Sequence, residues 1–367
     1  MTNIEWTDAT WNPVVGCTRV SAGCDHCYTV GMTRRLEGMA KGGPGRSGRK
    51  QHYAGLTVLN AKGDRHFNGT VRCVPEALGI PLHWKTPRRI FVNSMSDLFH
   101  RDVPFEFIDK VFAVMALCPQ HTFQVLTKRP ERMAKYLAHV DGVDDYGRPY
   151  STERRVNEQA KAIEYDRCRE AAWFSWPLPN VWLGTSCEDQ AAADERIPHL
   201  LRCPAAVRFL SCEPLLGPID IRPFLQALPG VLMCSHCGYR TNIAERYCPN
   251  SENDDIELRP DVGMDWVIVG GESGPKARPC NVDWIRSIVQ QCQEAAVPCF
   301  VKQLGSYPVC NDVDREKHDR GTLFVEDGVY RNRWIMKLID RKGGDPSEWP
   351  EDLRVREFPT PNGAVAC

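Results

Sequence analysis

The chain has 367 residues, of which 42% are hydrophobic and 25% charged, a composition typical of a soluble globular protein. Its 46 basic and 47 acidic residues leave a formal net charge of −1, which argues against a globally basic nucleic-acid coat or an acidic tail. No apolar run approaches the roughly 18 residues of a transmembrane helix, and the first residues lack the features of a secretory signal. We therefore expect a cytoplasmic protein without a membrane partner, whose 17 cysteines do not form a disulfide framework.

Short apolar runs alternate with amphipathic stretches along the chain, which is typical of a parallel sheet covered by helices. A first strand is predicted near residues 11–16, and further strands are predicted at 89–94, 122–127, 181–186, 207–211, 266–270 and 298–303. Helices are predicted at 104–118, from 130 onward, at 188–201 and at 282–296. Seven βα-like units favour an α/β fold with a partial or open (β/α) barrel of the TIM type, and a doubly wound sheet is the alternative.

Several segments interrupt this alternation and define the expected domain organisation. The barrel core is predicted to comprise residues 1–216 and 263–305, with insertions at 41–88 and 139–179. The first insertion begins Gly-rich and basic and predicts a mobile loop or insertion, and the second contains a helical patch at 153–173. Residues 217–262 form a separate cysteine-containing insertion, and residues 306–367 are expected to be an extension that packs on the barrel.

Polar residues follow each predicted strand, where the active sites of (β/α) barrels are built. Besides Cys17 after the first strand, the candidates are Asn93, Ser94, Asp97, Lys128, Thr185, Ser186, Glu213, Gly270, Gly271, Glu272 and Lys302. The series predicts that these residues together line one polar opening of the barrel. Strands that merely end in polar loops would explain only a few of them. For Glu213 and Lys302 the alternative is a mutual ion pair across the barrel.

Cys17, Cys24 and Cys27 form a C-x6-C-x2-C run directly after the first predicted strand. Three thiolates so close together can bind three irons of a [4Fe–4S] cluster and leave the fourth iron open to a small ligand. The alternatives are a zinc site completed by His26 or a distant ligand, and a purely structural group of thiols. A closed structural zinc site prefers two short ligand pairs, and this run contains only one.

A second group of cysteines lies in the 217–262 insertion, with Cys234, Cys237 and Cys248 in a pattern similar to a zinc ribbon or rubredoxin-like knuckle. A fourth cysteine is expected near position 251, where Ser251 stands. Either His236 or a remote residue completes a Zn²⁺ site, or the knuckle has lost its metal.

A three-cysteine loop after the first strand of a (β/α) barrel resembles the radical S-adenosylmethionine superfamily. Its members hold the amino and carboxylate groups of S-adenosylmethionine at the open iron and reduce it to a 5′-deoxyadenosyl radical. The usual spacing there is C-x3-C-x2-C. The chain also resembles, over almost its full length, a family of phage and bacterial proteins known for a three-cysteine motif and without an established reaction. The matching segments include IEWTDATWNPVVGCTRVSAGCDHCY, FVNSMSDLFH, VLTKRPERM, VWLGTSCEDQ, RFLSCEPLLGP and WVIVGGESGP.

The resemblance to the radical enzymes implies a role for each candidate residue. Cys17, Cys24 and Cys27 would ligate the cluster, with Tyr28 beside it. Asn93, Ser94 and Asp97 would contact the amino group of S-adenosylmethionine. Thr185, Ser186 and Glu213 would contact the ribose or carboxylate of S-adenosylmethionine. Gly270 and Gly271 would allow adenine or the substrate to approach the backbone closely, and Glu272 would be a polar anchor. The groups for an anionic substrate or for proton transfer would be Lys128 and Lys302, which with Glu213 form the catalytic set.

The sequence therefore predicts a radical S-adenosylmethionine-like [4Fe–4S] enzyme that needs an electron donor. Basic and aromatic residues, including Lys85, Arg88, Tyr53 and Trp84, favour a nucleic acid or nucleotide as substrate if they lie on the barrel rim. One alternative is an iron–sulfur or zinc metalloprotein without radical chemistry that binds nucleic acid or a protein partner. Another is an enzyme that uses the open iron as a Lewis acid.

Overall fold

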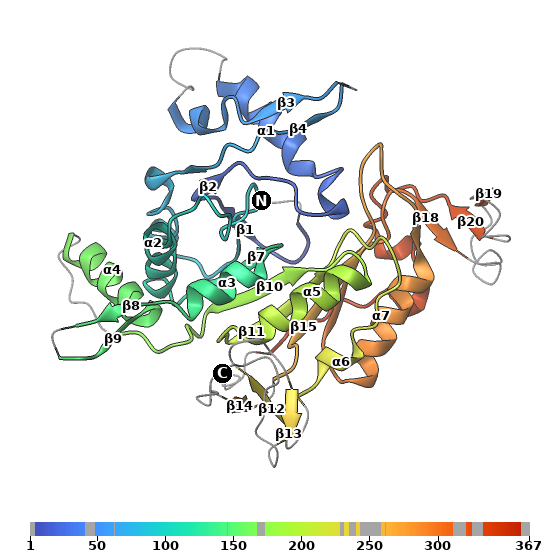
Figure 1. Ribbon diagram of the computed structural model, residues 1–367. Helices are drawn as coiled ribbons and strands as arrows, with labels where there is room; N and C mark the ends of the chain where they lie inside the picture. Colours follow the sequence, from blue (N-terminus) through green and yellow to red (C-terminus); the bar gives the residue numbers. More distant parts are fainter. Residues whose placement is uncertain are drawn as a thin grey trace. The chain divides into compact units, whose positions relative to one another are not determined.

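Seven strands of the computed structural model form its principal sheet, in the order β1-β6-β7-β10-β11-β15-β17 (Figure 1). Residues 4–40, 48–61, 63–144, 146–166, 173–227, 231–234, 240–242, 258–260, 262–310, 321–324 and 333–360 are described. The strands comprise Ala9–Trp11 (β1), Arg89–Val92 (β6), Thr122–Thr127 (β7), Val181–Ser186 (β10), Val207–Cys212 (β11), Trp266–Gly270 (β15) and Cys299–Gln303 (β17). The pairs β1–β6, β6–β7, β11–β15 and β15–β17 are parallel. An open sheet of this kind is consistent with the predicted partial barrel.

The chain divides into two compact units, each described here by itself. The first contains Met1–Gly184 and Cys203–Ala206, and the second contains Thr185–Arg202 and Val207–Cys367. Among the described residues, no helix has the length and apolar character needed to cross a membrane.

Helices follow most of the sheet strands, as the alternating pattern predicts. The helices of the first unit are Tyr28–Ala40 (α1), Phe105–Ala116 (α2), Pro130–Leu137 (α3) and Thr152–Asp166 (α4). Those of the second unit are Gln190–Leu201 (α5), Arg222–Leu225 (α6) and Val282–Glu294 (α7). Side-chain caps fix two of the starts, because Asp189 accepts from the backbone N–H of Ala192 and Asn281 accepts from that of Asp283.

The first strand differs from its prediction. The sheet strand β1 ends at Trp11, and Val14–Val15 form a separate short strand, β2, that pairs antiparallel with Arg72–Cys73 (β5). Pro13 lies between β1 and β2 and has no N–H to donate to a strand ladder, which explains the interruption. The cysteine loop therefore follows β2 rather than a strand of the principal sheet.

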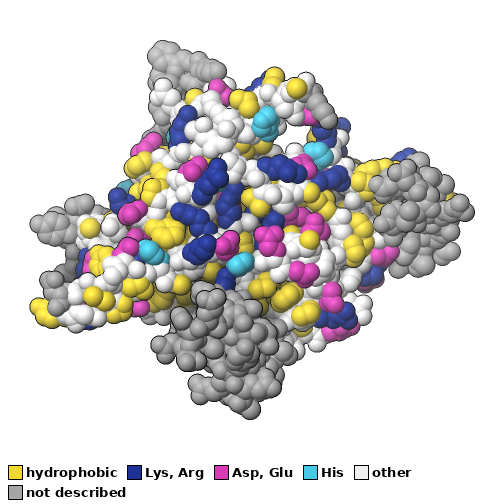
Figure 2. All heavy atoms as spheres, viewed as in Figure 1, with side chains coloured by type: hydrophobic (Ala, Val, Ile, Leu, Met, Phe, Trp, Pro, Cys, Tyr) yellow, Lys and Arg dark blue, Asp and Glu magenta, His cyan; other side chains and the backbone are white. Residues whose placement is uncertain are grey.

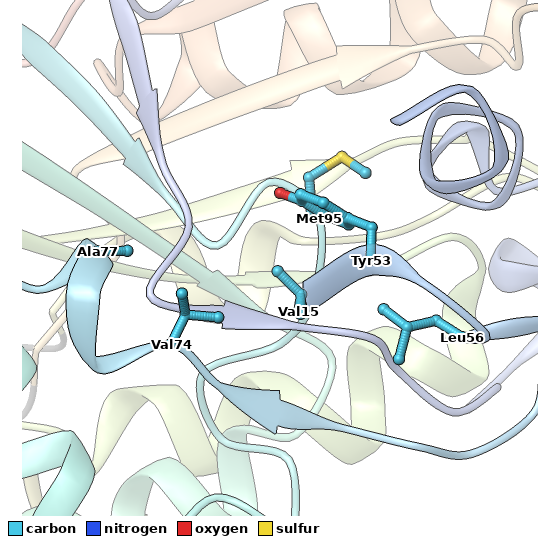
Figure 3. Packing of buried hydrophobic residues seen from close by; sticks show 6 residues of the cluster. All are labelled: Val15, Tyr53, Leu56, Val74, Ala77 and Met95. Carbon is cyan, nitrogen blue, oxygen red and sulfur yellow. The ribbon is translucent and has the colours of Figure 1, made fainter. Parts of the chain in front are cut away.

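The predicted insertion at 41–88 is folded wherever it is described. It contains the hairpin of Thr57–Leu59 (β3) and Arg65–Phe67 (β4), strand β5, and three 3₁₀ turns at Gly48–Tyr53, Pro75–Ala77 and Pro81–His83. Tyr53, Leu56, Val74 and Ala77 pack with Val15 and Met95 in one hydrophobic cluster (Figure 3). Burial raises the pKa of Tyr53 to about 12, and its ring is not available on the surface to stack on a base.

The remaining strands form small sheets outside the principal one. In the first unit, Val140–Val143 (β8) pairs with Pro149–Ser151 (β9). In the second unit, one small sheet contains Val231–Cys234 (β12), Arg240–Asn242 (β13) and Leu258–Pro260 (β14). Another contains Cys280–Asn281 (β16), Pro308–Cys310 (β18), Gly321–Phe324 (β19) and Arg333–Met336 (β20).

The end of the described chain lies along β17. The backbone N–H of Val301 donates to the carbonyl of Val355 at 2.8 Å, and that of Glu357 donates to the carbonyl of Cys299 at 2.8 Å. The guanidinium of Arg356 lies 5.1 Å from the ring centre of Trp349, which is buried. Two 3₁₀ turns, Pro346–Glu348 and Glu351–Leu353, precede this contact. The C-terminal segment therefore covers the free edge of β17.

Candidate functional site

The cysteine loop begins at a glycine that no other residue can replace without strain. Gly16 has a φ of +85°, and a Cβ on it would lie 2.1 Å from the carbonyl oxygen of Thr70. The loop then forms a 3₁₀ turn, Ala22–Cys24, and Tyr28 opens helix α1 just after Cys27. Cys17, Cys24 and Cys27 are all half-buried free thiols. The local fold thus presents three thiols from one short loop.

The surroundings of the thiols are partly apolar and partly charged. The pKa of Cys17 is raised to about 12, chiefly by burial and also by the charge of Asp97, while the charge of Arg129 lowers it. Burial also raises the pKa of Cys27, whose sulfur lies 2.9 Å from the hydroxyl oxygen of Thr29. Negative charge on Cys27 raises the pKa of Cys17, and negative charge on Cys24 raises the pKa of Cys27.

The donor set suits an iron–sulfur cluster in its chemistry, because three thiols share one loop and two cations lie near them. Arg129 reaches the sulfur of Cys17, and the positive charge of Lys128 lowers the pKa of Cys27. In the part of the chain that the structure describes, no three His, Cys, Asp or Glu side chains are close enough together to hold a single metal ion.

Asp97 organises the residues around the loop. Its Oδ1 accepts from the Thr127 hydroxyl at 2.7 Å and from the Phe99 N–H at 3.0 Å. Its Oδ2 accepts from Arg129 Nη1 at 2.8 Å and from the Lys128 N–H at 3.1 Å. The predicted residues Asp97 and Lys128 are therefore brought to the cysteine loop, but the carboxylate of Asp97 is already occupied by four donors from this chain.

Arg129, Thr18 and His100 complete this group. Arg129, like Lys128, follows the predicted strand at 122–127, whereas sequence reasoning did not identify Thr18 or His100 as site residues. The Thr18 hydroxyl accepts from Arg129 Nη2 at 2.8 Å and lies 2.8 Å from His100 Nε2. The Nδ1 of His100 accepts from the Asp102 N–H at 3.2 Å, which assigns the proton to Nε2. Burial, and next the charge of Arg129, lower the pKa of His100.

Asn93 is the most unusual residue of the first unit. It follows β6, has a φ of +60° and is only 2% exposed. Neither Oδ1 nor Nδ2 of its side chain has a hydrogen-bond partner. A buried amide without partners costs about 1–3 kcal/mol, and left-handed backbone at a residue other than glycine adds strain. Such features concentrate at ligand-binding positions.

Ser94 and Tyr28 connect the end of β6 to the start of α1. The Tyr28 hydroxyl donates to the carbonyl of Ser94 at 2.9 Å, and the Ser94 hydroxyl lies 3.2 Å from Asn12 Oδ1. The Tyr28 side chain remains more than half exposed. These contacts place Ser94 beside the first turn after the cysteine loop.

In the second unit, Glu213 and Lys302 form the ion pair that the sequence offered as the alternative. Lys302 Nζ lies 2.6 Å from Glu213 Oε1, and the two side chains are 17% and 16% exposed. Gln303 Nε2 donates to the same oxygen at 3.3 Å. The structure therefore brings these two candidates together, and each is the other's partner.

Glu272 has a similar partner, because Arg278 donates to its Oε1 at 2.6 Å and to its Oε2 at 2.9 Å. Thr185 and Ser186 are buried at the end of β10, and the carbonyl of Ser186 accepts from Arg196 at 2.7 Å. Binding of S-adenosylmethionine by these residues stays a prediction.

Gly270 and Gly271 have a reason to be glycine within their own unit. A Cβ on Gly271 would lie 2.2 Å from the carbonyl oxygen of Leu304, and one on Gly270 would lie 3.0 Å from that of Gln303. The atoms that exclude a side chain at these two positions are backbone atoms of this chain, at Gln303 and Leu304. Their proposed contact with adenine or substrate is not needed to explain them.

The second cysteine group lies almost wholly outside the described residues. Cys237 and Cys248 belong to segments that are not described, and Cys234 is described only as the last backbone position of β12. The predicted Zn²⁺ site stays a prediction.

Comparison with known proteins places the chain in a family. Residues 1–333 match the family described as "Protein of unknown function (DUF5131)". The chain belongs to this family. No curated protein matches the chain, and no solved structure does.

Proposed function

We propose that this DUF5131 protein is a radical S-adenosylmethionine-type enzyme with a [4Fe–4S] cluster on Cys17, Cys24 and Cys27. The observation that carries the proposal is that one short loop presents three half-buried thiols, with Arg129 at the sulfur of Cys17 and the charge of Lys128 acting on Cys27, in the unit that also holds the unpartnered amide of Asn93. Three protein thiolates leave one iron of a cubane open, and a bound cluster supplies one-electron reduction at that iron.

The residues of this chain have separate tasks in the proposal. Gly16 turns the loop and Thr29 contacts the sulfur of Cys27. Arg129 and Lys128 offset negative charge on the thiolates. Asn93 offers one donor and one acceptor to the polar end of a ligand, which would satisfy its buried amide.

A nucleic acid or nucleotide is the proposed substrate class. Figure 2 shows Lys and Arg side chains gathered over the part of the first unit where β2 and α3 are drawn in Figure 1. A local group of cations on a chain of nearly neutral net charge is suited to bind phosphates. A titration of the protein with a labelled oligonucleotide at low salt checks this part, and no binding there would remove it.

The reaction is tested by adding dithionite and S-adenosylmethionine to the anaerobically reconstituted full chain and measuring 5′-deoxyadenosine and methionine. We expect both products, and we expect the Cys27→Ala variant to form neither. The matched control is Cys73→Ala, which changes a half-buried cysteine of the same unit outside the loop. An iron-loaded protein that releases neither product would refute the radical reaction and leave a metalloprotein of another kind.

A further inference from the structure

We propose that Arg129 is a positioning residue whose guanidinium clamps the cysteine loop through Thr18 and donates to the Cys17 sulfur, thereby raising the reduction potential of the cluster. This inference rests on the proposed function, because it concerns the iron–sulfur cluster that the loop would hold. Arg129 lies outside the cysteine motif, although with Lys128 it is among the polar residues that follow the predicted strand at 122–127.

The contacts of Arg129 define its geometry closely. Nη1 lies 2.8 Å from Asp97 Oδ2 and 3.8 Å from the Cys17 sulfur. Nη2 donates to the carbonyl and to the hydroxyl of Thr18, at 3.0 and 2.8 Å. The side chain is 16% exposed. A planar guanidinium with donors in a fixed fork can make all four contacts at once, which the single ammonium of lysine cannot.

Two sets of hydrogen bonds, one through Asp97 and one through Thr18, hold the guanidinium of Arg129 in place. Arg129 follows strand β7 directly, and its own N–H donates to the Thr127 hydroxyl at 2.8 Å, while that hydroxyl donates to Asp97. His100, whose Nδ1 accepts from the Asp102 N–H, donates from Nε2 to the Thr18 hydroxyl, which therefore receives two donors. Asp97 and Thr18 thus hold the guanidinium against Cys17, and the three groups come from distant parts of the sequence.

The electrostatic consequence follows from charge and distance. A hydrogen-bond donor and a positive charge beside a cluster sulfur stabilise the reduced cluster, which carries one more electron, and so raise the reduction potential. Asp97 partly compensates the charge of Arg129. Replacing Arg129 by a neutral residue would leave the Asp97 carboxylate uncompensated near Cys17. This negative charge would lower the reduction potential of the cluster further.

The first unit also contains a second arginine–aspartate pair that serves as a control. Arg155 Nε lies 3.0 Å from Asp109 Oδ2, and the two side chains are 6% and 3% exposed. The other donors of Arg155 bind Thr152 and the carbonyls of His139 and Tyr150. An Arg→Lys change at this pair likewise removes a guanidinium from a buried aspartate of the first unit, but no sulfur contact is lost.

The experiment uses the full chain, reconstituted anaerobically with iron and sulfide, as wild type and as the variants Arg129→Gln, Arg129→Lys and Arg155→Lys. Iron and sulfide content is measured first, followed by an EPR-monitored redox titration. We expect Arg129→Gln to lower the equilibrium constant for reduction about tenfold, which is about 59 mV for one electron. Arg129→Lys should give a smaller decrease in the same direction, and Arg155→Lys should match the wild type.

Potentials of Arg129→Gln and Arg129→Lys equal to that of the wild type would overturn the inference while leaving the proposed cluster intact. If Arg129→Gln fails to fold or to bind iron, Arg129→Lys decides the question, because it keeps the charge and loses the fork. A lowered potential in Arg129→Lys alone supports the role, and an unchanged one overturns it. A wild-type protein that binds no iron would instead overturn the proposed function, and this inference with it.

Discussion

In the first unit the polar groups that follow β6 and β7 surround the cysteine loop, whereas in the second unit those that follow β11 and β17 pair with one another. Asp97 and Arg129 bind each other, and Arg129 also donates to Thr18 and to the sulfur of Cys17. Glu213 and Lys302 form an ion pair supported by Gln303. The same sequence feature, a charged residue just after a strand, therefore has two different outcomes.

Strain and unsatisfied polarity coincide at one residue of the first unit, whereas in the second unit the left-handed Ala296 and the unsatisfied Nε of Arg196 belong to different residues. In the first unit, Asn93 combines left-handed backbone with a buried amide that lacks partners. In the second unit, the buried Glu272 and Glu188 are each bound by an arginine, Arg278 and Arg196. Unsatisfied buried polarity costs stability, and it is retained where a ligand can use it. Asn93 is therefore the buried polar group that a ligand of the proposed site would satisfy.

The largest expected effect is the loss of iron on changing the loop. Cys24→Ala removes one of three thiolate ligands, so iron after reconstitution should fall from about four per chain to near background. Cys73→Ala, at a half-buried cysteine of the same unit, should retain the wild-type iron content. Equal iron in both variants would show that the loop is not the ligand set.

Substitutions at two glycines distinguish an effect on stability from an effect on metal binding. Gly16→Ala and Gly271→Ala each place a Cβ within 2.2 Å of a backbone oxygen, so each should lower the free energy of unfolding by about 1–3 kcal/mol. Only Gly16→Ala should also lower the iron content, because Gly16 directs the cysteine loop. Denaturant unfolding and iron analysis measure both, with Gly31→Ala, where a Cβ meets no atom within 4 Å, as the control. An iron loss as large in Gly271→Ala would contradict the comparison.

Lys302→Met tests whether the ion pair of the second unit is structural. The variant leaves Glu213 without its charged partner and should lower the free energy of unfolding by about 1–3 kcal/mol. It should leave iron content and S-adenosylmethionine cleavage in the absence of substrate unchanged. A stable variant with impaired cleavage would instead assign Lys302 to the chemistry.

The smallest expected change is at Asn93. Asn93→Gly removes both the unpartnered amide and the left-handed strain, so the unliganded protein should become more stable by about 1 kcal/mol. The same change should weaken the stabilisation that added S-adenosylmethionine gives the wild type in thermal unfolding. A variant that is less stable than the wild type would show that the Asn93 side chain supports the fold.

Much of the sheet could be predicted because its strands are buried apolar runs. Val181–Ser186 and Trp266–Gly270 have the predicted bounds, and every residue of both strands is buried. The first strand was misplaced because the pattern does not weigh the missing N–H of Pro13. The insertion at 41–88 was predicted as a mobile loop or insertion, and its packed interior was not predicted, because its apolar residues are spaced so widely that only the fold brings them together.

The candidate site was predictable only where it is local in sequence. The cysteine spacing is visible in eleven consecutive residues, and Asp97 follows a recognisable strand. The contacts of Arg129 join positions 111 and 112 residues apart, and the contact of His100 with Thr18 spans 82 residues. No local sequence pattern indicates contacts between residues that are so far apart in the chain. The ion pair of Glu213 with Lys302 was foreseen as an alternative because opposite charges end two predicted strands of the sheet.

The central claim is tested most directly by anaerobic purification of the full chain, followed by iron, sulfide and zinc analysis and EPR of the dithionite-reduced protein. The account predicts about four irons per chain and a reduced-cluster signal that S-adenosylmethionine perturbs. Zinc alone, with no iron after reconstitution, would contradict it and leave the cysteine loop as a zinc-binding or structural element.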